Sequence, residues 1–249
     1  MDHIQEYWTE SSDNFSEYID REYLGDSAES WKKFILNEIG EGELNILDIG
    51  TGPGFFPLIL SSDKRKVTGI DLTEAMVKQA REKLKKNNVN AQILAMDCQN
   101  TTFEDETFDV IICRNLVWTL SDPKKAYKEW YRLLKKGGKL LVFDGLWYGY
   151  IFFEDLKEQH TKRKAYVEEK YNAKVTPYGD PVEFKRDYDL MKTLFLSDKR
   201  RPDWDRQYLT ELGYTIEKIK DEYLDEIIGR EERDKRGNIS PLFFIKAKK

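Results

Sequence analysis

The stretch ILDIGTGPGFF, from Ile46 to Phe56, places three glycines directly after an apolar run that contains Asp48. The run predicts a buried strand over Leu44–Ile49, and Phe55–Leu60 predicts the start of a helix. Glycine lets the backbone turn tightly and approach another molecule closely. The stretch therefore predicts a strand, a glycine-rich turn and a helix, with a ligand bound at the turn.

Downstream, short apolar segments alternate with segments of helical periodicity. Thr73 is placed to cap one helix, Asp122-Pro123 opens another, and Gly137-Gly138 is expected to end that second helix at its C′ position. This alternation predicts an α/β fold, with a doubly wound, mostly parallel seven-stranded sheet of the Rossmann-like type. The predicted strands are residues 44–49, 66–71, 91–96, 108–113, 139–143, 214–219 and 242–247, and the last two are expected to form a hairpin at the sheet edge.

Composition limits the classes of partner. The 249 residues carry a formal net charge of −5 and a pI near 5.4, so a nucleic-acid partner is unlikely, because nucleic-acid binders usually present a basic face. Two cysteines, Cys98 and Cys113, and two histidines give no metal-ligand pattern and no disulfide framework, so no metal is predicted. The sequence contains no apolar run of about 18 residues, and its acidic N-terminus has no signal-peptide core. A cytoplasmic protein without membrane contact is expected.

The acidic residue at the end of the second predicted strand identifies the kind of ligand. Asp71 lies about 20 positions after Gly50, where an acidic side chain accepts hydrogen bonds from ribose hydroxyls. An adenosine-type ligand is therefore expected. A nicotinamide dinucleotide is disfavoured, because its fingerprint needs glycine or alanine where Phe55 stands, and a bulky side chain there disturbs helix–strand packing.

Asp48-Ile49-Gly50-Thr51-Gly52-Pro53-Gly54 resembles the first motif of class I S-adenosylmethionine-dependent methyltransferases. The resemblance continues in order over residues 44–145, through GIDLTEAM (69–76), AMDC (95–98), FDVIICRN (108–115) and LLKKGGKLLVFD (133–144). It implies the Rossmann-like methyltransferase fold and an enzyme that uses S-adenosyl-L-methionine and releases S-adenosyl-L-homocysteine. The methyl group would pass by in-line displacement to a small-molecule acceptor.

The resemblance also implies roles for individual residues. The first motif, with Asp48, Gly50, Thr51, Gly52 and Gly54, would surround the methionine moiety. Asp71 would hold the ribose, with Leu72 and Met76 beside the adenosine. Asp97 would accept from the adenine amine, with Met96 and Cys98 flanking the ring, while Arg114 and Asn115 would close the underside of the cofactor. For Met76 and Met96 the alternative is ordinary core packing.

The sequence divides into four predicted regions. Residues 1–40 are expected to form an N-terminal helical lid, although helices packed on the core are an equal alternative. Residues 41–145 form the cofactor-binding core, and residues 207–249 complete its sheet. Residues 146–206, between the fifth strand and the last helix, form a helical and aromatic insertion that acts as a substrate lid.

No motif identifies the residues that bind the methyl acceptor, but the sequence offers several candidates. Tyr7, Trp8, Trp118, Tyr148 and Trp204 are expected to line the substrate space. The catalytic group is unknown. His160, Asp144 and Tyr148 are candidates for a general base, because a hydroxyl or protonated amine acceptor must lose a proton; the alternative for His160 is a surface position in a charged helix.

Other functions stay open at this level. A methyltransferase acting on protein or nucleic acid shares the fold, although neither the [ND]-P-P-[YF] motif nor a Pro-Cys pair is present. A non-catalytic cofactor-binding module of the same fold is another alternative. The acceptor atom and the oligomeric state are not indicated by the sequence.

Overall fold

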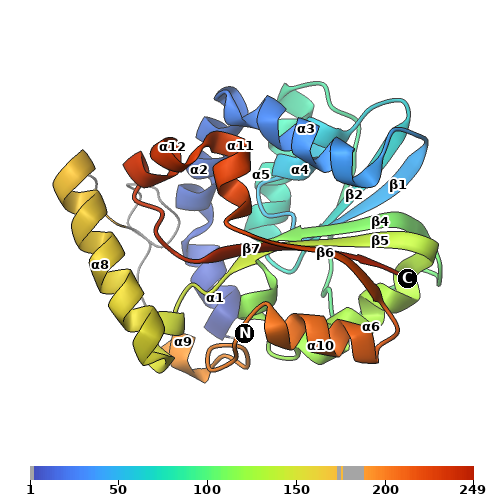
Figure 1. Cartoon of the computed structure of the whole chain (residues 1–249). Coiled ribbons are helices and arrows are strands. Elements are labelled where there is room, and N and C mark those ends of the chain that lie inside the picture. Colours follow the sequence, from blue (N-terminus) through green and yellow to red (C-terminus); the bar gives the residue numbers. More distant parts are fainter. Residues whose placement is uncertain (1–2, 173–174, 176–187) are drawn as a thin grey trace.

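The structure is a computed structural model that describes residues 3–172, 175 and 188–249. In this part of the chain, seven strands form one sheet in the order β3-β2-β1-β4-β5-β7-β6 (Figure 1). β1 to β5 run parallel, and β7 is antiparallel to β5 and to β6. The predicted doubly wound, mostly parallel sheet is confirmed. The strands are β1 (Leu44–Ile49), β2 (Arg65–Asp71), β3 (Gln92–Ala95), β4 (Phe108–Arg114), β5 (Leu134–Gly145), β6 (Thr215–Asp221) and β7 (Leu242–Lys248).

The strand order places a topological switch point at the centre of the sheet. β1 pairs with β2 on one side and with β4 on the other, so that Ile49 lies opposite both Ile70 and Cys113. Asp71, at the end of β2, lies opposite Ala95 at the end of β3. The carboxyl ends of β1, β2, β3 and β4 therefore meet at one edge, where open α/β sheets bind ligands.

Helices cover both faces of the sheet (Figure 1). α3, α4, α5 and α11 lie against one face, and α6 and α10 lie against the other. The helices described are α1 (His3–Glu10), α2 (Ser12–Leu24), α3 (Ser27–Ile39), α4 (Phe55–Leu60), α5 (Glu74–Lys86), η1 (Val117–Thr119), α6 (Pro123–Leu133), α7 (Gly149–Phe152), α8 (Glu154–Tyr171), α9 (Tyr188–Thr193), α10 (Asp203–Glu211), α11 (Tyr223–Ile228) and α12 (Arg230–Lys235).

The prediction that Gly137-Gly138 ends the helix was wrong. α6 ends at Leu133, and β5 already begins at Leu134 and runs through both glycines. The register against β4 shifts between Phe108 and Val110, so the extra residues form an irregularity in the strand pair. A Cβ at Gly138 would lie 2.8 Å from the carbonyl oxygen of Lys135. Gly138 therefore allows close backbone contact inside a bulged strand, and Gly137 adopts a positive φ of +77°. A glycine pair is typical of such a bulge and of a helix end alike.

The end of the chain also differs from prediction. β6 and β7 pair antiparallel as expected, but α11 and α12 lie between them, so they are not a simple hairpin and α10 is not the last helix. The connection is long because α11 packs against α3 on the opposite side of the sheet from α10.

The two outer regions are helical where they are described. Residues 3–39 form α1, α2 and α3, and the predicted insertion contributes α7, α8, α9 and the start of α10; residues 173–174 and 176–187 of that insertion lie outside the described residues. α8 stands apart from the sheet, beside α12 (Figure 1). Across the described ranges, none of the helices has the length and apolar character needed to span a membrane.

Candidate functional site

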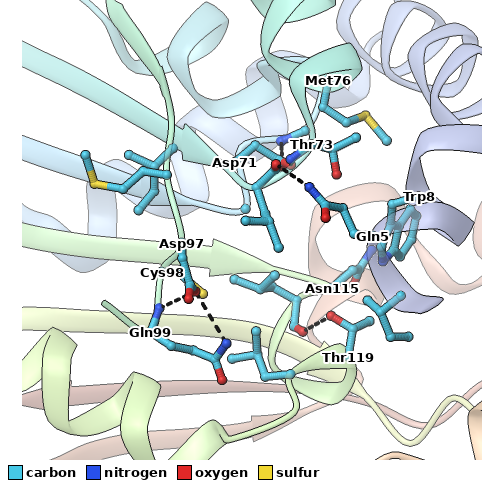
Figure 2. Close-up of a pocket in the computed structure, with 18 of the residues that line it drawn as sticks. Gln5, Trp8, Asp71, Thr73, Met76, Asp97, Cys98, Gln99, Asn115 and Thr119 are labelled. Carbon is cyan, nitrogen blue, oxygen red and sulfur yellow. Dashed lines mark hydrogen bonds between the residues drawn. The ribbon is translucent and has the colours of Figure 1, made fainter. Parts of the chain in front are cut away.

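A cleft of about 840 Å³, partly open to solvent, lies at the carboxyl ends of β1, β2, β3 and β4. Clefts at the switch point of an α/β sheet are typical sites for cofactors and small molecules. Figure 2 shows side chains from the strand ends and from α1 gathered around it. Its lining is Ile4, Gln5, Trp8, Phe15, Gly50, Gly52, Ile70, Asp71, Leu72, Thr73, Met76, Met96, Asp97, Cys98, Gln99, Arg114, Asn115, Leu116, Thr119, Leu120 and Ser121.

The glycine loop after β1 forms the floor of this cleft. Gly50 has φ +66°, in the left-handed region that favours glycine. A Cβ at this position would lie 2.8 Å from Cδ1 of Leu116, so a side chain would also collide with the opposite wall. Both constraints require glycine and leave the backbone of the loop facing the cleft.

Asp71 connects this loop to the end of β2. Its Oδ2 accepts from the backbone N–H of Gly52 at 2.9 Å, and its Oδ1 accepts from that of Thr73 at 2.9 Å. Burial raises the pKa of Asp71, while these backbone hydrogen bonds lower it. Each carboxylate oxygen keeps capacity for a further donor, so the carboxylate can bind a hydroxyl pair in the cleft without releasing the loop.

A second acidic side chain lies at the end of β3. Asp97 Oδ1 accepts from the backbone N–H of Gln99 at 2.8 Å and from its side-chain amide at 3.3 Å. Met96 N–H donates to the carbonyl of Asp71 at 2.9 Å, which fixes this turn against β2. Figure 2 shows Asp97 and Cys98 beside Gln99, on the segment next to that of Asp71.

Asp48, Thr51 and Gly54 do not belong to the cleft lining of the described chain; they support the loop from beneath. Thr51 Oγ1 donates to Asp48 Oδ2 at 2.6 Å. Asp48 is 2% exposed, and burial raises its pKa to about 7, against the lowering effects of Thr51 and Arg114. Gly54, with φ +91°, lies against Ala80 of α5. These residues therefore shape the loop rather than face a ligand.

Arg114 lies where β4 ends. Its Nη1 donates to Glu22 Oε1 at 3.0 Å, and its Nη2 lies 2.9 Å from Glu22 Oε2, so it forms a two-point ion pair with α2. The guanidinium carbon lies 4.5 Å from the ring centre of Phe55 and 4.9 Å from that of Trp31. Arg114 thus faces the cleft and also holds α2 in place.

Asn115 follows at the same strand end. Its φ is +56°, a conformation that non-glycine residues adopt infrequently, and its N–H donates to the carbonyl of Phe143 at 2.8 Å. Its side-chain Oδ1 is buried without a hydrogen-bond partner among the described residues. An unsatisfied acceptor in a cleft lining is a position where a ligand donor fits.

The N-terminal helices close one side of the cleft. Gln5 Nε2 donates to the carbonyl of Leu72 at 3.2 Å, and Trp8 packs edge-on against Phe15 at 5.6 Å between ring centres. Trp8 lines this cleft, whereas Tyr7 is buried in the apolar core; the prediction that both residues line the substrate space stays a prediction. The sequence analysis missed Ile4 and Gln5, for which no local pattern gives a signal.

The opposite side is formed by residues 116–121, which we call the wall segment. Leu116, Thr119, Leu120 and Ser121 face the cleft, whereas Trp118 lines a second, smaller hollow together with Tyr148. The rings of Trp118 and Tyr148 are 5.6 Å apart. Thr119 and Ser121 were also missed, because the segment reads as an ordinary loop.

The remaining acceptor-side candidates are spread out. Asp144 is fully buried, and its two oxygens accept hydrogen bonds from four groups. His160 lies on α8, with its ring 4.1 Å from that of Tyr150. Trp204 stacks on Tyr208 at 5.6 Å, next to α6. Neither His160 nor Trp204 belongs to the lining of the cleft as described.

Comparison with known proteins agrees with this geometry. Residues 47–142 match the family model described as a methyltransferase domain. The chain is 33% identical over 121 residues to phosphatidylethanolamine N-methyltransferase of Cereibacter sphaeroides, covering 48% of this chain and 59% of that protein. It is 30% identical over 108 residues to ubiquinone biosynthesis O-methyltransferase of Coxiella burnetii (strain Dugway 5J108-111), covering 43% and 46% respectively. The chain thus spans about half the length of these curated relatives.

The fold has solved counterparts. The crystal structure of a SAM-dependent methyltransferase from Aquifex aeolicus superposes with a TM-score of 0.56 at 19% identity, covering 94% of this chain and 97% of that one. At this identity the superposition shows a shared fold. The matched methyltransferase domain includes most of the glycine loop, and the superposition shows that the fold around this domain is shared as well.

Proposed function

We propose that this protein transfers a methyl group from S-adenosyl-L-methionine to a small-molecule acceptor and releases S-adenosyl-L-homocysteine. The observation that carries the proposal is the cleft itself, in which the glycine loop, Asp71 and Asp97 lie at adjacent strand ends. The domain match and the curated methyltransferases that share it support the same activity.

The residues present fit such a cofactor. Asp71 has acceptor capacity for the ribose hydroxyls, and Asp97 for the adenine amine, with Leu72, Met76, Met96 and Cys98 as apolar neighbours. The glycine loop and Arg114 would enclose the methionine part. The unpartnered Oδ1 of Asn115 is the observation that tests the fit, since a buried acceptor in an otherwise satisfied lining gains from a ligand donor.

The protein's share of the chemistry is orientation. The bound sulfonium supplies an activated methyl group and a good leaving group. Trp8 and Phe15 line one side of the cleft and the wall segment lines the opposite side, so the two would hold the reactants between them. Holding both reactants in line can lower the barrier by about 7–11 kcal/mol, which needs no catalytic triad.

A proton must leave when the acceptor is a hydroxyl or a protonated amine. Asp144 is unsuited to this role, because its oxygens already accept from Gly145, Trp147, Trp118 and Arg201. His160 lies on α8 against Tyr150. Tyr148, which shares the second hollow with Trp118, stays a candidate.

A small acceptor is favoured over a macromolecule. The net charge of −5 offers no general attraction to nucleic acid. The relatives act, by their names, on different acceptors, and residues 1–40 and 146–206 lie outside the matched domain. We propose that these regions are the cofactor lid and the substrate lid. A protein acceptor, or a module that binds the cofactor without turnover, are the competing functions.

Calorimetric titration with S-adenosylmethionine, S-adenosylhomocysteine, NADH and NADPH tests the proposal. We expect micromolar binding of the first two and no binding of the nicotinamide nucleotides. A metabolite extract with a labelled methyl donor then identifies the acceptor. Binding of NADH or NADPH alone would overturn the proposal, and cofactor binding without labelled product in any extract would favour the non-catalytic module.

A further inference from the structure

A buried charge network lies behind the wall segment. Asp144 is at 0% exposure and Arg201 at 5%. Arg201 Nη1 donates to Asp144 Oδ2 at 2.7 Å, and its Nε and Nη2 donate to the two oxygens of Asp205 at 2.8 and 2.9 Å. Tyr127 Oη donates to Asp205 Oδ1 at 2.6 Å. The network therefore joins β5, α6, α10 and the segment before α10.

Asp144 passes this restraint to both sides of the second hollow. Its Oδ2 accepts from the backbone N–H of Trp118 at 3.2 Å, and its Oδ1 accepts from the indole Nε1 of Trp147 at 2.9 Å. Trp118, Trp147 and Arg201 all line that hollow. One carboxylate thus fixes the backbone of the wall segment on one side and a tryptophan ring on the other.

The wall segment connects Trp118 to the lining of the cofactor cleft. Trp118 Nε1 donates to the carbonyl of Asn115 at 3.0 Å, and Thr119 Oγ1 donates to that of Leu116 at 2.7 Å. Leu116 approaches Gly50 across the cleft, and Thr119 lies in the same lining. A displacement of Trp118 would therefore move side chains that face the cofactor.

Stability alone is a poor reason for such a network. Buried ion pairs lose hydration energy that their attraction barely restores, and apolar replacements are often equally stable. What the network adds is a fixed direction, because both oxygens of Asp205 hold the arginine fork in one plane and the remaining Nη1 then points at Asp144. Asp144, held in this orientation, accepts from Trp118 on one side of the second hollow and from Trp147 on the other.

We propose that the Asp144–Arg201 pair is a positioning element that holds the wall segment between the cofactor cleft and the second hollow, so that cofactor affinity depends on a pair that lies outside the cleft lining. This inference rests on the proposed function for its ligand. It assigns Asp144 the role of a positioning residue in place of a base.

The test uses the full-length protein and four variants. Asp144→Asn removes the charge and keeps the shape, Arg201→Met removes the fork, and Arg201→Lys keeps the charge without the fork. The control is Arg233→Met, because Arg233 is also buried at 1% exposure and hydrogen-bonded to the carbonyl of Asn238, but lies in α12 away from both hollows. Each protein is measured for S-adenosylhomocysteine affinity by calorimetry, for thermal stability, and for hydrogen exchange of the peptide that contains the Trp118 amide.

We expect Asp144→Asn and Arg201→Met to weaken S-adenosylhomocysteine binding at least about tenfold, with Arg201→Lys between them and the wild type. The Trp118 amide should exchange faster in the first two. Arg233→Met should lose thermal stability and keep both wild-type affinity and wild-type exchange at Trp118. A merely structural role for the pair would lower stability in all variants without this difference.

Wild-type affinity in both Asp144→Asn and Arg201→Met would overturn the inference, as would an equal loss of affinity in Arg233→Met. Absence of S-adenosylhomocysteine binding by the wild type would instead overturn the proposed function. In that case the exchange of the Trp118 amide still decides whether Asp144 holds the wall segment.

Discussion

The two sides of the cleft are built differently. On the strand-end side, Asp71 and Asp97 are held by hydrogen bonds to residues two positions away, Thr73 and Gln99, and Asp71 also binds Gly52, 19 residues away. On the helical side, the cover is held by contacts far apart in sequence: Gln5 with Leu72, 67 residues away, and Glu22 with Arg114, 92 residues away. The strand-end side is therefore specified locally, whereas the cover depends on tertiary ion pairs and packing.

This difference predicts where each kind of damage appears. A change on the strand-end side removes a ligand contact from a sheet that stays folded. A change in the ion pair of the cover exposes a buried charge, and so it reduces the stability of the N-terminal helices first. The substitutions below separate the two effects, in order of decreasing size.

The largest effect is expected for Glu22→Ala. This variant leaves Arg114 buried without its carboxylate, and removing one partner of a buried pair costs about 3–5 kcal/mol. Glu22 also accepts from Trp31 Nε1 at 2.9 Å, so a second donor loses its partner. The measurement is the free energy of unfolding from urea titration. The control is Glu158→Ala, which breaks an exposed pair with Lys162 on α8 and should unfold like the wild type. An equal free energy of unfolding in both variants would show that the buried pair contributes no more than the exposed one.

Asp71→Ala should act on binding. We expect S-adenosylhomocysteine affinity to fall by about 1–3 kcal/mol, or roughly five- to 150-fold, because the ribose hydroxyls and the Gly52 N–H lose their acceptor. Calorimetry measures this, with Asp63→Ala as an exposed control between α4 and β2. Unchanged affinity in Asp71→Ala would contradict the ribose assignment.

Asp48→Asn should change the pH dependence of stability. Burial raises the pKa of Asp48 from 3.8 to about 7, so between these values the folded carboxyl keeps a proton that the unfolded one has lost. The free energy of unfolding then falls as the pH rises, by at most about 1.4 kcal/mol per pH unit. The variant lacks this loss and should become less pH-sensitive than the wild type across that range. Denaturant unfolding at several pH values measures it; parallel curves would show that Asp48 does not titrate there.

Gln5→Ala should have the smallest effect. Its hydrogen bond to the Leu72 carbonyl is exposed, and the change should alter cofactor affinity by less than about 0.5 kcal/mol. A larger loss of cofactor affinity in calorimetry would mean that the cover contacts the ligand directly. The two sides of the cleft would then not differ in the way described above.

Much of the strand-end side could be predicted from sequence. Parallel strands end at one edge of a sheet, so the glycine loop and Asp71 could be placed together from their positions after apolar runs. Asp97 was predicted through the family resemblance. Gly137-Gly138 shows where this reading fails, since a glycine pair is equally typical of a helix end and of a bulged strand. Register against β4 decided between them, and no local pattern encodes register with a strand that lies elsewhere in the chain.

By itself, then, the sequence determined the sheet and its ligand edge, because strand periodicity and glycine conformation are local properties. The tertiary structure alone decided that Arg114 pairs with Glu22, that Gln5 closes the cleft, and that Asp144 is committed to Arg201 and the wall segment. These roles depend on which residues meet across the fold. A side chain's hydrogen-bond partners and burial set its chemistry, and both are fixed only when distant segments pack together.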